Sequence, residues 1–419
     1  MRRPTRWLRP ALAVLAVIAG VLIPAGPAAA TVTCTFNGGT GLMRLVWERG
    51  DSVTVARSGD SITVNGGDCG GATVTTTDRI DAAPTETGGE LVIDLAGGPF
   101  EPGLTAEASG QSEIEFTGDL YSAPLTIIGS EGRDHIVFGS AGMNLNADES
   151  SPDADVTLLR VTEYRIFGNG GNDVIRGDGG IGTGVGTISP VKAMIDGGDG
   201  DDEVAGTKLS DELIGGPGID TVDYVANTTW SRISLKLGTA TTSVGFDSLA
   251  GFENVDGSPA MDIIEGSNGP NVLRGFDADD TLSGLGGDDV IVCGKGDDEV
   301  DFTKARGKIT VNLAKGFSRG EGTDVVLGCE DVQGSRFGDR ITGTNKGNEV
   351  DGAGGADVIN TGGGSDIIQG GDGDDTIRAG AGDDFVYAGN GDDWIDGGPG
   401  YDSCPTSPGH DTRRNCEIP

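Results

Sequence analysis

The sequence predicts an all-β fold in which short strands stack as the parallel coils of a β-solenoid. The first observation is a nine-residue repeat that recurs along the chain, because internal repetition at a fixed period is the signature of a repeat architecture. The second is composition, since glycine accounts for 76 of the 419 residues and aromatic residues for only 5%. Such a chain cannot build one large aromatic core. Its regular repetition argues against the disorder that low hydrophobicity and high charge would otherwise indicate.

Residues 1–30 have the features of a secretory signal peptide. Four arginines precede an apolar run over residues 11–23, and three alanines ending at Ala30 provide a small-residue cleavage site. The apolar run is shorter than the roughly 20 residues that span a bilayer. We therefore expect cleavage after Ala30 and a mature protein that is secreted and extracellular, with no membrane span.

The mature chain is strongly acidic. The signal segment holds four of the 29 Lys and Arg residues and none of the 66 Asp and Glu residues, which leaves 25 basic against 66 acidic side chains and a net charge of −41. A protein with this charge repels other polyanions. We therefore expect no nucleic-acid partner and no binding to anionic membranes.

Residues 31–165 are expected to form a β-rich N-terminal region. β-branched and polar residues alternate there in short segments bounded by turn residues, as in DSVTVARSGD over 51–60. We expect this region to cap the solenoid and to merge into it near Thr126. A separate β-sandwich is the alternative.

The repeats form an interrupted segment, 166–333, and a continuous segment, 334–405. The continuous segment divides into eight nonapeptides without gaps. The interrupted segment holds a single unit over 168–176, three units over 197–223 and five units over 257–301. The sixth residue of a unit is Asp or Asn, and the eighth is almost always aliphatic.

Two spacers, 224–256 and 302–333, interrupt the repeats and resemble each other in sequence. Phe252 to Val255 in the first matches Cys329 to Val332 in the second. Each spacer is just under four nonapeptides long, so we expect extra coils with a looped-out insert at both places. Residues 406–419 are expected to form a C-terminal cap.

Each repeat unit supplies one turn and one strand. Glycines at positions one, two and four permit positive φ and a tight turn that exposes its carbonyl groups to a ligand. The last three residues form a short strand whose middle side chain, at position eight, points inward. Two units make a coil of about 18 residues, so the position-six carboxylates form two acidic columns with about 4.8 Å between coils. We expect a cation between the coils, because the columns would otherwise repel the fold apart.

Calcium suits these turns best, because it accepts six to eight carboxylate and carbonyl oxygens in flexible arrangements. Magnesium requires a stricter octahedron. Zinc is disfavoured because the mature chain has two histidines, His135 and His410, and six scattered cysteines. We therefore expect Ca²⁺ as the cofactor.

The units GGDGDDTIR, AGAGDDFVY, AGNGDDWID and GGPGYDSCP resemble the GGxGxDxUx repeat of the haemolysin-type, or RTX, calcium-binding family. The resemblance implies a right-handed parallel β-roll in which each calcium ion is held between turns two units apart. The ligand pairs that it implies are Asp357 with Asp375, Asp375 with Asp393, Asp366 with Asp384, Asp384 with Asp402, Asp202 with Asp220, Asp262 with Asp280, and Asp280 with Asp298. Three further ligands that it implies are Asp173, Asp289 and Asp339.

The six cysteines are expected to form disulfides, because the chain carries a secretion signal. Proximity in the sequence favours Cys34 with Cys69, Cys293 with Cys329, and Cys404 with Cys416. Six cysteines allow 15 pairings, so this connectivity is a preference. The last pair would hold the C-terminal tail over the final coil, where a solenoid needs a cap.

The chain has neither an HExxH helix nor a GxSxG elbow, and no catalytic or pore-forming domain is evident. We therefore expect a non-enzymatic, secreted calcium-binding β-roll that folds on calcium binding and has a structural, adhesive or cell-surface role. Its partner could be an extracellular glycan or a cell-surface molecule. The alternatives are a polysaccharide-acting β-helix enzyme, either a lyase or an epimerase, and a carbohydrate-binding adhesin.

Overall fold

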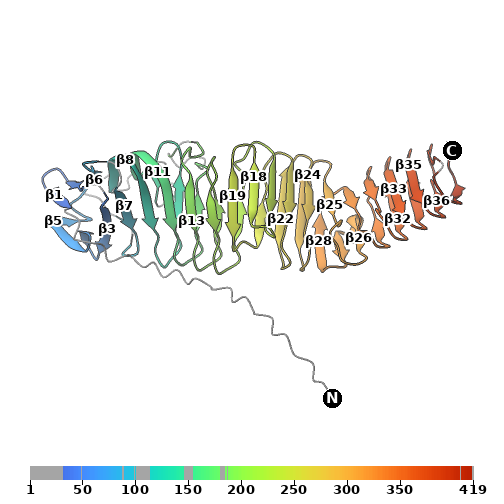
Figure 1. Ribbon diagram of the computed structural model, residues 1–419, viewed down its shortest axis with the longest axis horizontal. Helices are drawn as coiled ribbons and strands as arrows, with labels where there is room; N and C mark the ends of the chain where they lie inside the picture. The colour runs from blue at the N-terminus through green and yellow to red at the C-terminus, as the bar shows by residue number, and fades with distance from the viewer. Residues whose placement is uncertain are drawn as a thin grey trace, which may run out of the picture.

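The computed structural model describes residues 32–48, 50–86, 89–98, 100, 114–145, 154–179, 185, 187–405 and 407–417. These residues form one elongated stack of strands, with β1 near one end and β36 near the other (Figure 1). The expected all-β solenoid is confirmed, because most strand pairs in the repeats are parallel. The expected signal peptide, 1–30, lies outside the described residues.

The strands preceding the repeat blocks are joined to them by two long strands, β8 and β11. The strands of this part are β1 (Thr33–Asn37), β2 (Leu42–Val46), β3 (Ser52–Ser58), β4 (Ser61–Val64), β5 (Gly67–Thr73), β6 (Arg79–Ala82), β7 (Glu90–Asp94), β8 (Glu115–Ile128), β9 (His135–Phe138), β10 (Met143–Asn144) and β11 (Val156–Phe167). β8 pairs in parallel with β6 through its first half and with β7 through its second. β11 then pairs with β8 and β13, so the same sheet continues into the repeats.

The repeat blocks and the first spacer contain strands of three to six residues. They are β12 (Val174–Arg176), β13 (Ala193–Asp196), β14 (Glu203–Ala205), β15 (Glu212–Ile214), β16 (Thr221–Asp223), β17 (Ser231–Ser234), β18 (Thr239–Thr242), β19 (Phe246–Ala250), β20 (Asn254–Asp256), β21 (Asp262–Glu265), β22 (Val272–Asp277), β23 (Thr281–Ser283), β24 (Val290–Lys295) and β25 (Glu299–Asp301).

The second spacer and the continuous repeats follow, with one short 3-10 helix, η1 (Leu313–Lys315), in the spacer. Their strands are β26 (Thr310–Asn312), β27 (Phe317–Arg319), β28 (Thr323–Leu327), β29 (Asp331–Gln333), β30 (Arg340–Thr342), β31 (Glu349–Asp351), β32 (Val358–Gly363), β33 (Ile367–Asp372), β34 (Thr376–Ala381), β35 (Phe385–Asn390), β36 (Trp394–Asp396) and β37 (Thr412–Arg414). Among the described residues there is no helix with the length and hydropathy that a membrane span requires.

Successive repeat strands alternate between two parallel ladders. Ladder A contains β13, β15, β21, β23, β25, β29, β31, β33 and β35. Ladder B contains β12, β14, β16, β20, β22, β24, β30, β32, β34 and β36. Position eight pairs with position eight one coil further on, as Ile359 does with Ile377 and Ile377 with Ile395. Two units therefore make one coil, as the period predicts.

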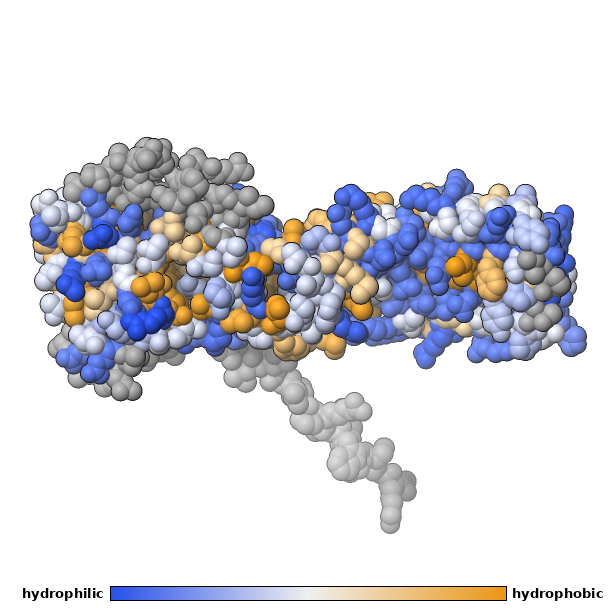
Figure 2. All heavy atoms as spheres, turned by 90° about the horizontal axis from the view of Figure 1, so that it is seen from above, coloured by the Kyte–Doolittle hydropathy of each residue, from blue (hydrophilic) through white to orange (hydrophobic). Residues whose placement is uncertain are grey.

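The position-eight side chains form an aliphatic core between the two ladders. Ile359, Ile368, Ile377, Val386 and Ile395 are fully buried. The buried aromatic side chains lie in the N-terminal part and in the first spacer. The exterior of the C-terminal coils is mostly hydrophilic (Figure 2). The free energy gained by burying this small core therefore has to outweigh the repulsion between the acidic side chains on the surface.

Each spacer places three antiparallel strands where an ordinary coil has one. In the first spacer, β19, β18 and β17 lie between β15 and β21 in ladder A, while ladder B passes directly from β16 to β20. In the second, β28, β27 and β26 lie between β24 and β30 in ladder B, while ladder A passes from β25 to β29. The extra coils that we expected are thus extra strands on one face. Each spacer adds two extra strands to one ladder, and the two spacers act on opposite ladders. Beyond the second spacer both ladders have therefore gained the same number of strands, and the coils are level again.

All three expected disulfides are present, and no described cysteine is free. Cys34 and Cys69 join β1 to β5, with 5.7 Å between their Cα atoms. Cys293 and Cys329 link the first residue of a repeat to the end of the second spacer. Cys404 fills the last position eight of the core, and its bond to Cys416 fastens the C-terminal segment to the final coil.

Candidate metal centres

The position-six aspartates of neighbouring coils are directly connected. The backbone N–H of Asp357 donates to Oδ1 of Asp375 over 2.8 Å, and that of Asp375 donates to Asp393 over 2.9 Å. The same contact joins Asp366 to Asp384 on the other edge of the roll. These hydrogen bonds form two columns: column 1 follows the turns from ladder A to ladder B, and column 2 follows the turns from B to A.

The second carboxylate oxygen of these aspartates has no such contact. In eleven of them Oδ2 is buried and has no hydrogen-bond partner among the described residues. A buried charged oxygen without a partner is costly, so it marks a place that favours a bound cation. In column 1 these residues are Asp173, Asp202 and Asp220, then Asp357, Asp375 and Asp393. In column 2 they are Asp280 and Asp298, then Asp366, Asp384 and Asp402.

A second class of turn satisfies its carboxylate internally. These units have Ser or Thr at position two, and its backbone N–H donates to Oδ2 of the position-six aspartate. The distance is 2.7 Å from Ser335 to Asp339 and 2.6 Å from Thr207 to Asp211. The hydroxyl of Ser335 adds a bond of 2.9 Å to Oδ1 of Asp339. In these turns neither carboxylate oxygen is left for a metal.

The backbone at position two distinguishes the two classes. All eleven turns with a free Oδ2 have positive φ there, including the non-glycine residues Ala353 at +69° and Phe276 at +81°. The Ser and Thr residues of the other class do not. With positive φ the position-two N–H points along the stack, and that of Gly380 donates to the carbonyl of Gly397 in the next coil. The N–H is thereby withdrawn from Oδ2.

The spacers end the columns with glutamates that sequence reasoning did not identify. Oε2 of Glu253 accepts the N–H of Asp220 over 3.0 Å, in place of a position-six aspartate. The next position six in column 1 is Asn271, whose Nδ2 donates to the carbonyl of Glu253 over 2.6 Å. Glu330 and Asn348 repeat this last contact at the same distance after the second spacer. Each Asn unit is the second unit after a spacer and follows the spacer's glutamate in its column, where an amide donor is needed and a carboxylate would not serve.

The free carboxylates also repel one another. Burial raises the pKa of Asp357 to about 8, against the hydrogen bond from the Asp339 N–H, and the charge of Asp375 adds to the rise. Burial similarly raises the pKa of Asp375 to about 7, with Asp393 as its nearest repelling charge. Opposite charge between the coils would remove both penalties at once.

One further unit was missed at the C-terminus. The frame of nine continues over 406–414, which places Gly409 at position four and Asp411 at position six, and this continuation was the available signal. Asp393 donates to Oδ1 of Asp411 over 3.4 Å, and β37 pairs with β36. Position eight is Arg413, whose Nη2 lies 2.9 Å from Oδ2 of Asp411. Although burial raises the pKa of Asp411, the hydrogen bonds from Arg413 and Ser407 lower it overall, so a guanidinium neutralises the last carboxylate.

Of the fourteen sequence-predicted ligands, eleven are thus the aspartates with a free Oδ2. Asp262 and Asp339 belong to the serine turns instead, since Ser258 and Ser335 bond to them. Asp289 has the positive-φ backbone, at Leu285, but stands between Asn271 and Asp324 in its column. No three His, Cys, Asp or Glu side chains of the described chain converge on one point. A metal held here would therefore need backbone carbonyls as well as carboxylates.

Comparison with known families agrees with this geometry. The family of the RTX calcium-binding nonapeptide repeat matches four segments, 165–183, 256–291, 333–368 and 369–404. A comparison with curated proteins gives no match. The matched segments contain eight of the eleven aspartates with a free Oδ2. The other three are Asp202, Asp220 and Asp298, and their turns have the same positive φ at position two. The chain therefore carries the RTX calcium-binding nonapeptide repeat in four copies between residues 165 and 404, within its all-β solenoid.

Proposed function

We propose that the protein is a secreted calcium-binding β-roll that folds when it binds calcium and serves a structural, adhesive or cell-surface role. One observation carries the proposal: eleven buried Oδ2 atoms without hydrogen-bond partners lie in four runs along two columns. A run of neighbouring coils offers carboxylates on both sides of each gap between turns. RTX repeats are typically structural, so we expect no enzymatic activity.

The residues fit calcium better than other metals. Calcium accepts carboxylate and carbonyl oxygens together, and the turns offer no other kind of ligand. All six cysteines are in disulfides, so no thiolate is available for zinc. When bound, the ion supplies positive charge between the coils. Asp357, Asp375 and Asp393 would hold it in column 1, and Asp366, Asp384 and Asp402 in column 2.

Calcium binding and folding are coupled in this proposal. Glycine-rich turns lose much conformational entropy on ordering, and the buried carboxylates add repulsion. A ligand that binds only the folded state stabilises it by about 2.7 kcal/mol per site at a hundredfold excess over Kd. Four such sites would contribute on the order of 10 kcal/mol, comparable with the stability of a whole domain.

Secretion provides the setting for this coupling. Disulfides persist in oxidising compartments, and extracellular calcium-binding modules commonly have Kd values of roughly 10⁻⁴–10⁻³ M. Before export, scarce calcium would leave the repeats unfolded and easy to translocate. Outside the cell, millimolar calcium would order the roll.

The experiment is a calcium titration of the mature protein, residues 31–419. Far-ultraviolet circular dichroism should show the β signal of the repeats increasing cooperatively, and equilibrium dialysis should show several calcium ions bound per chain. Chelator should reverse both changes. A full β spectrum in chelator, together with no bound calcium at millimolar concentration, would contradict the proposal.

A further inference from the structure

A groove runs along ladder A and the neighbouring turns beside the first spacer. It consists of two adjoining hollows of roughly 380 Å³ and 270 Å³, both of which Lys304 lines. The spacer strands β17 and β18, which have no counterpart in the ordinary coils, form one side of it. The groove is therefore a feature of this chain and not of the nonapeptide repeat.

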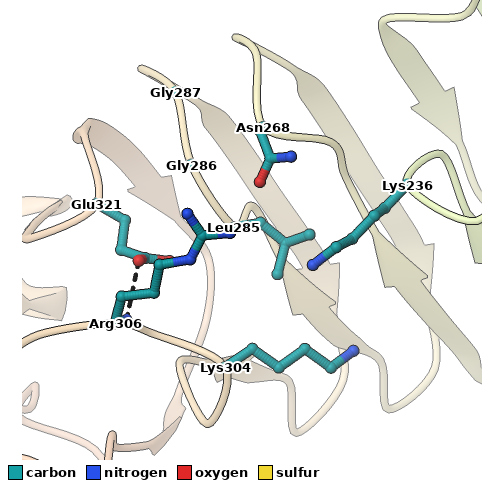
Figure 3. Close-up of a pocket in the computed structure, with 8 residues that line it drawn as sticks. All are labelled: Lys236, Asn268, Leu285, Gly286, Gly287, Lys304, Arg306 and Glu321. Carbon is teal, nitrogen blue, oxygen red and sulfur yellow. Dashed lines mark hydrogen bonds between the residues drawn. The ribbon is translucent and has the colours of Figure 1, made fainter. Parts of the chain in front are cut away.

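The first hollow is basic, although the protein is strongly acidic. Lys236 comes from the connection between β17 and β18, whereas Lys304 and Arg306 come from the start of the second spacer (Figure 3). In Figure 3 the Lys236 ammonium group and the Arg306 guanidinium group both lie near Leu285, with Asn268 beside them. Three cationic side chains thus converge from segments about 70 residues apart in sequence.

These cations are not fully neutralised by the protein. The Lys304 ammonium lies 2.7 Å from Oε2 of Glu265, and the Lys236 ammonium lies 3.9 Å from Oε1 of the same carboxylate. Glu321 accepts the backbone N–H of Arg306 over 2.9 Å. The Arg306 guanidinium has no ion pair with any residue that the structure describes. One buried glutamate therefore holds two ammonium groups in place, and positive charge remains for a ligand.

The second hollow is lined by a regular row of polar side chains, here called the hydroxyl row, in which the carboxylate of Glu265 stands between the hydroxyls of Ser234 and Ser283. Asp301 lines the hollow as well. Strand register aligns Thr239 with Ser234, Ser234 with Glu265, and Glu265 with Ser283. Neighbouring strands are about 4.8 Å apart, so polar groups are offered at that interval. The exposed apolar side chains of Leu237 and Ile263 lie in the same hollow. Hydroxyl and aliphatic groups in one hollow match a sugar ring, which presents hydroxyl edges and C–H faces.

We propose that this groove binds an acidic oligosaccharide, with a carboxylate or sulfate group in the basic hollow and adjoining sugar rings on the hydroxyl row. The charge of −41 disfavours long polyanions such as nucleic acid, whose many charges would extend along the acidic rod. An acidic peptide would satisfy the cations but would leave the hydroxyl row without partners. This inference rests on the proposed function only in that the roll must be folded, so calcium is present throughout its test.

The test is calorimetry on the calcium-loaded mature protein with short oligosaccharides of equal length that are carboxylated, sulfated or neutral, and with an oligo-aspartate peptide. Arg306→Gln and Lys236→Gln each remove one cation from the groove. Lys315→Gln is the matched control, because Lys315 is an exposed cation at the end of η1 and outside the groove. Calcium stoichiometry and circular dichroism are measured on the same samples.

We expect a carboxylated or sulfated oligosaccharide to bind and neutral ones to bind at least tenfold more weakly. Each groove variant should lose about tenfold or more in affinity for the acidic oligosaccharide, because it loses a charge-assisted hydrogen bond. The Lys315→Gln protein should bind like the parent. The inference is overturned if no acidic oligosaccharide binds, if oligo-aspartate binds equally well, or if the control loses as much affinity as the groove variants. Calcium stoichiometry reports separately on the proposed function, because it does not depend on the glycan.

Discussion

The backbone N–H of Asp357 donates to Oδ1 of Asp375, 2.8 Å away in the next coil, and Oδ2 of Asp375 is buried with no hydrogen-bond partner among the described residues. One oxygen therefore serves the stacking of the coils, and the other is available to a ligand. Because Asp375 also donates its own N–H to Asp393, it belongs to two successive gaps between turns. This double role makes it the most informative residue for mutation.

Replacing Asp375 with Ala should reduce the bound calcium by two ions per chain, because the residue borders two proposed sites. Asp211→Ala is the matched control, since Thr207 already satisfies its carboxylate. That change should destabilise the fold by about 1–3 kcal/mol through lost buried hydrogen bonds without changing the calcium stoichiometry. Equal losses of calcium in both variants, measured by calorimetry, would show that the free Oδ2 does not identify the sites.

Replacing Ser335 with Gly should create a calcium site. Glycine can adopt the positive φ found at position two of the other class, which would release Oδ2 of Asp339 beside Asp357. We expect one more bound calcium ion per chain. Ser267→Gly is the control, because its unit has Asn271 at position six and no carboxylate to release. An unchanged stoichiometry in both variants would mean that serine at position two is not what excludes the metal.

Much of this arrangement could be read from the sequence, because a strict period needs only residue type and position. In every unit position eight comes two residues after position six, as Ile377 comes after Asp375. The position-eight side chain therefore lies inside the roll, and the position-six side chain lies in a turn. The five units between the spacers are an odd number, which places the second spacer on the opposite ladder from the first. The internal pairing of each spacer could not be read, since antiparallel strands there depend on contacts outside the period.

The two classes of turn were also beyond the sequence pattern alone. Ala353 and Phe276 occupy positive φ although they are not glycine, because the neighbouring coils hold the backbone there. Glycine content at position two therefore underestimates the first class. The presence of Ser or Thr at that position identifies the second class, but its meaning became clear only from the contact between Ser335 and Asp339.

Removing the C-terminal disulfide should loosen the last coil and leave the rest of the roll intact. Cys416→Ser keeps Cys404 as a buried thiol in the core but frees the segment that carries Asp411. Loss of a native disulfide typically costs about 2–4 kcal/mol. Hydrogen exchange should therefore accelerate at β36 and β37. Cys34→Ser, at the other end of the molecule, should leave exchange at these strands unchanged, and a similar acceleration there would argue against a local cap.

The last prediction concerns pH, and it has opposite signs with and without calcium. In the calcium-free fold, burial raises the pKa of Asp357 to about 8 and that of Asp375 to about 7, whereas both are near 3.8 in the unfolded chain. Between about pH 4 and pH 8 the folded state therefore binds more protons than the unfolded state. Its stability must fall as pH rises through this window, because each carboxyl has to lose a proton in a buried, negatively charged place.

Calcium reverses this dependence, because it binds the same oxygens only when they are deprotonated. In chelator, circular dichroism should show more residual β signal at pH 5 than at pH 8, and the difference should shrink in Asp357→Asn, which cannot ionise. In saturating calcium the midpoint of urea unfolding should instead be higher at pH 8 than at pH 5. A calcium-free β signal that rises between pH 5 and pH 8 would show that protons and calcium do not share the position-six carboxylates.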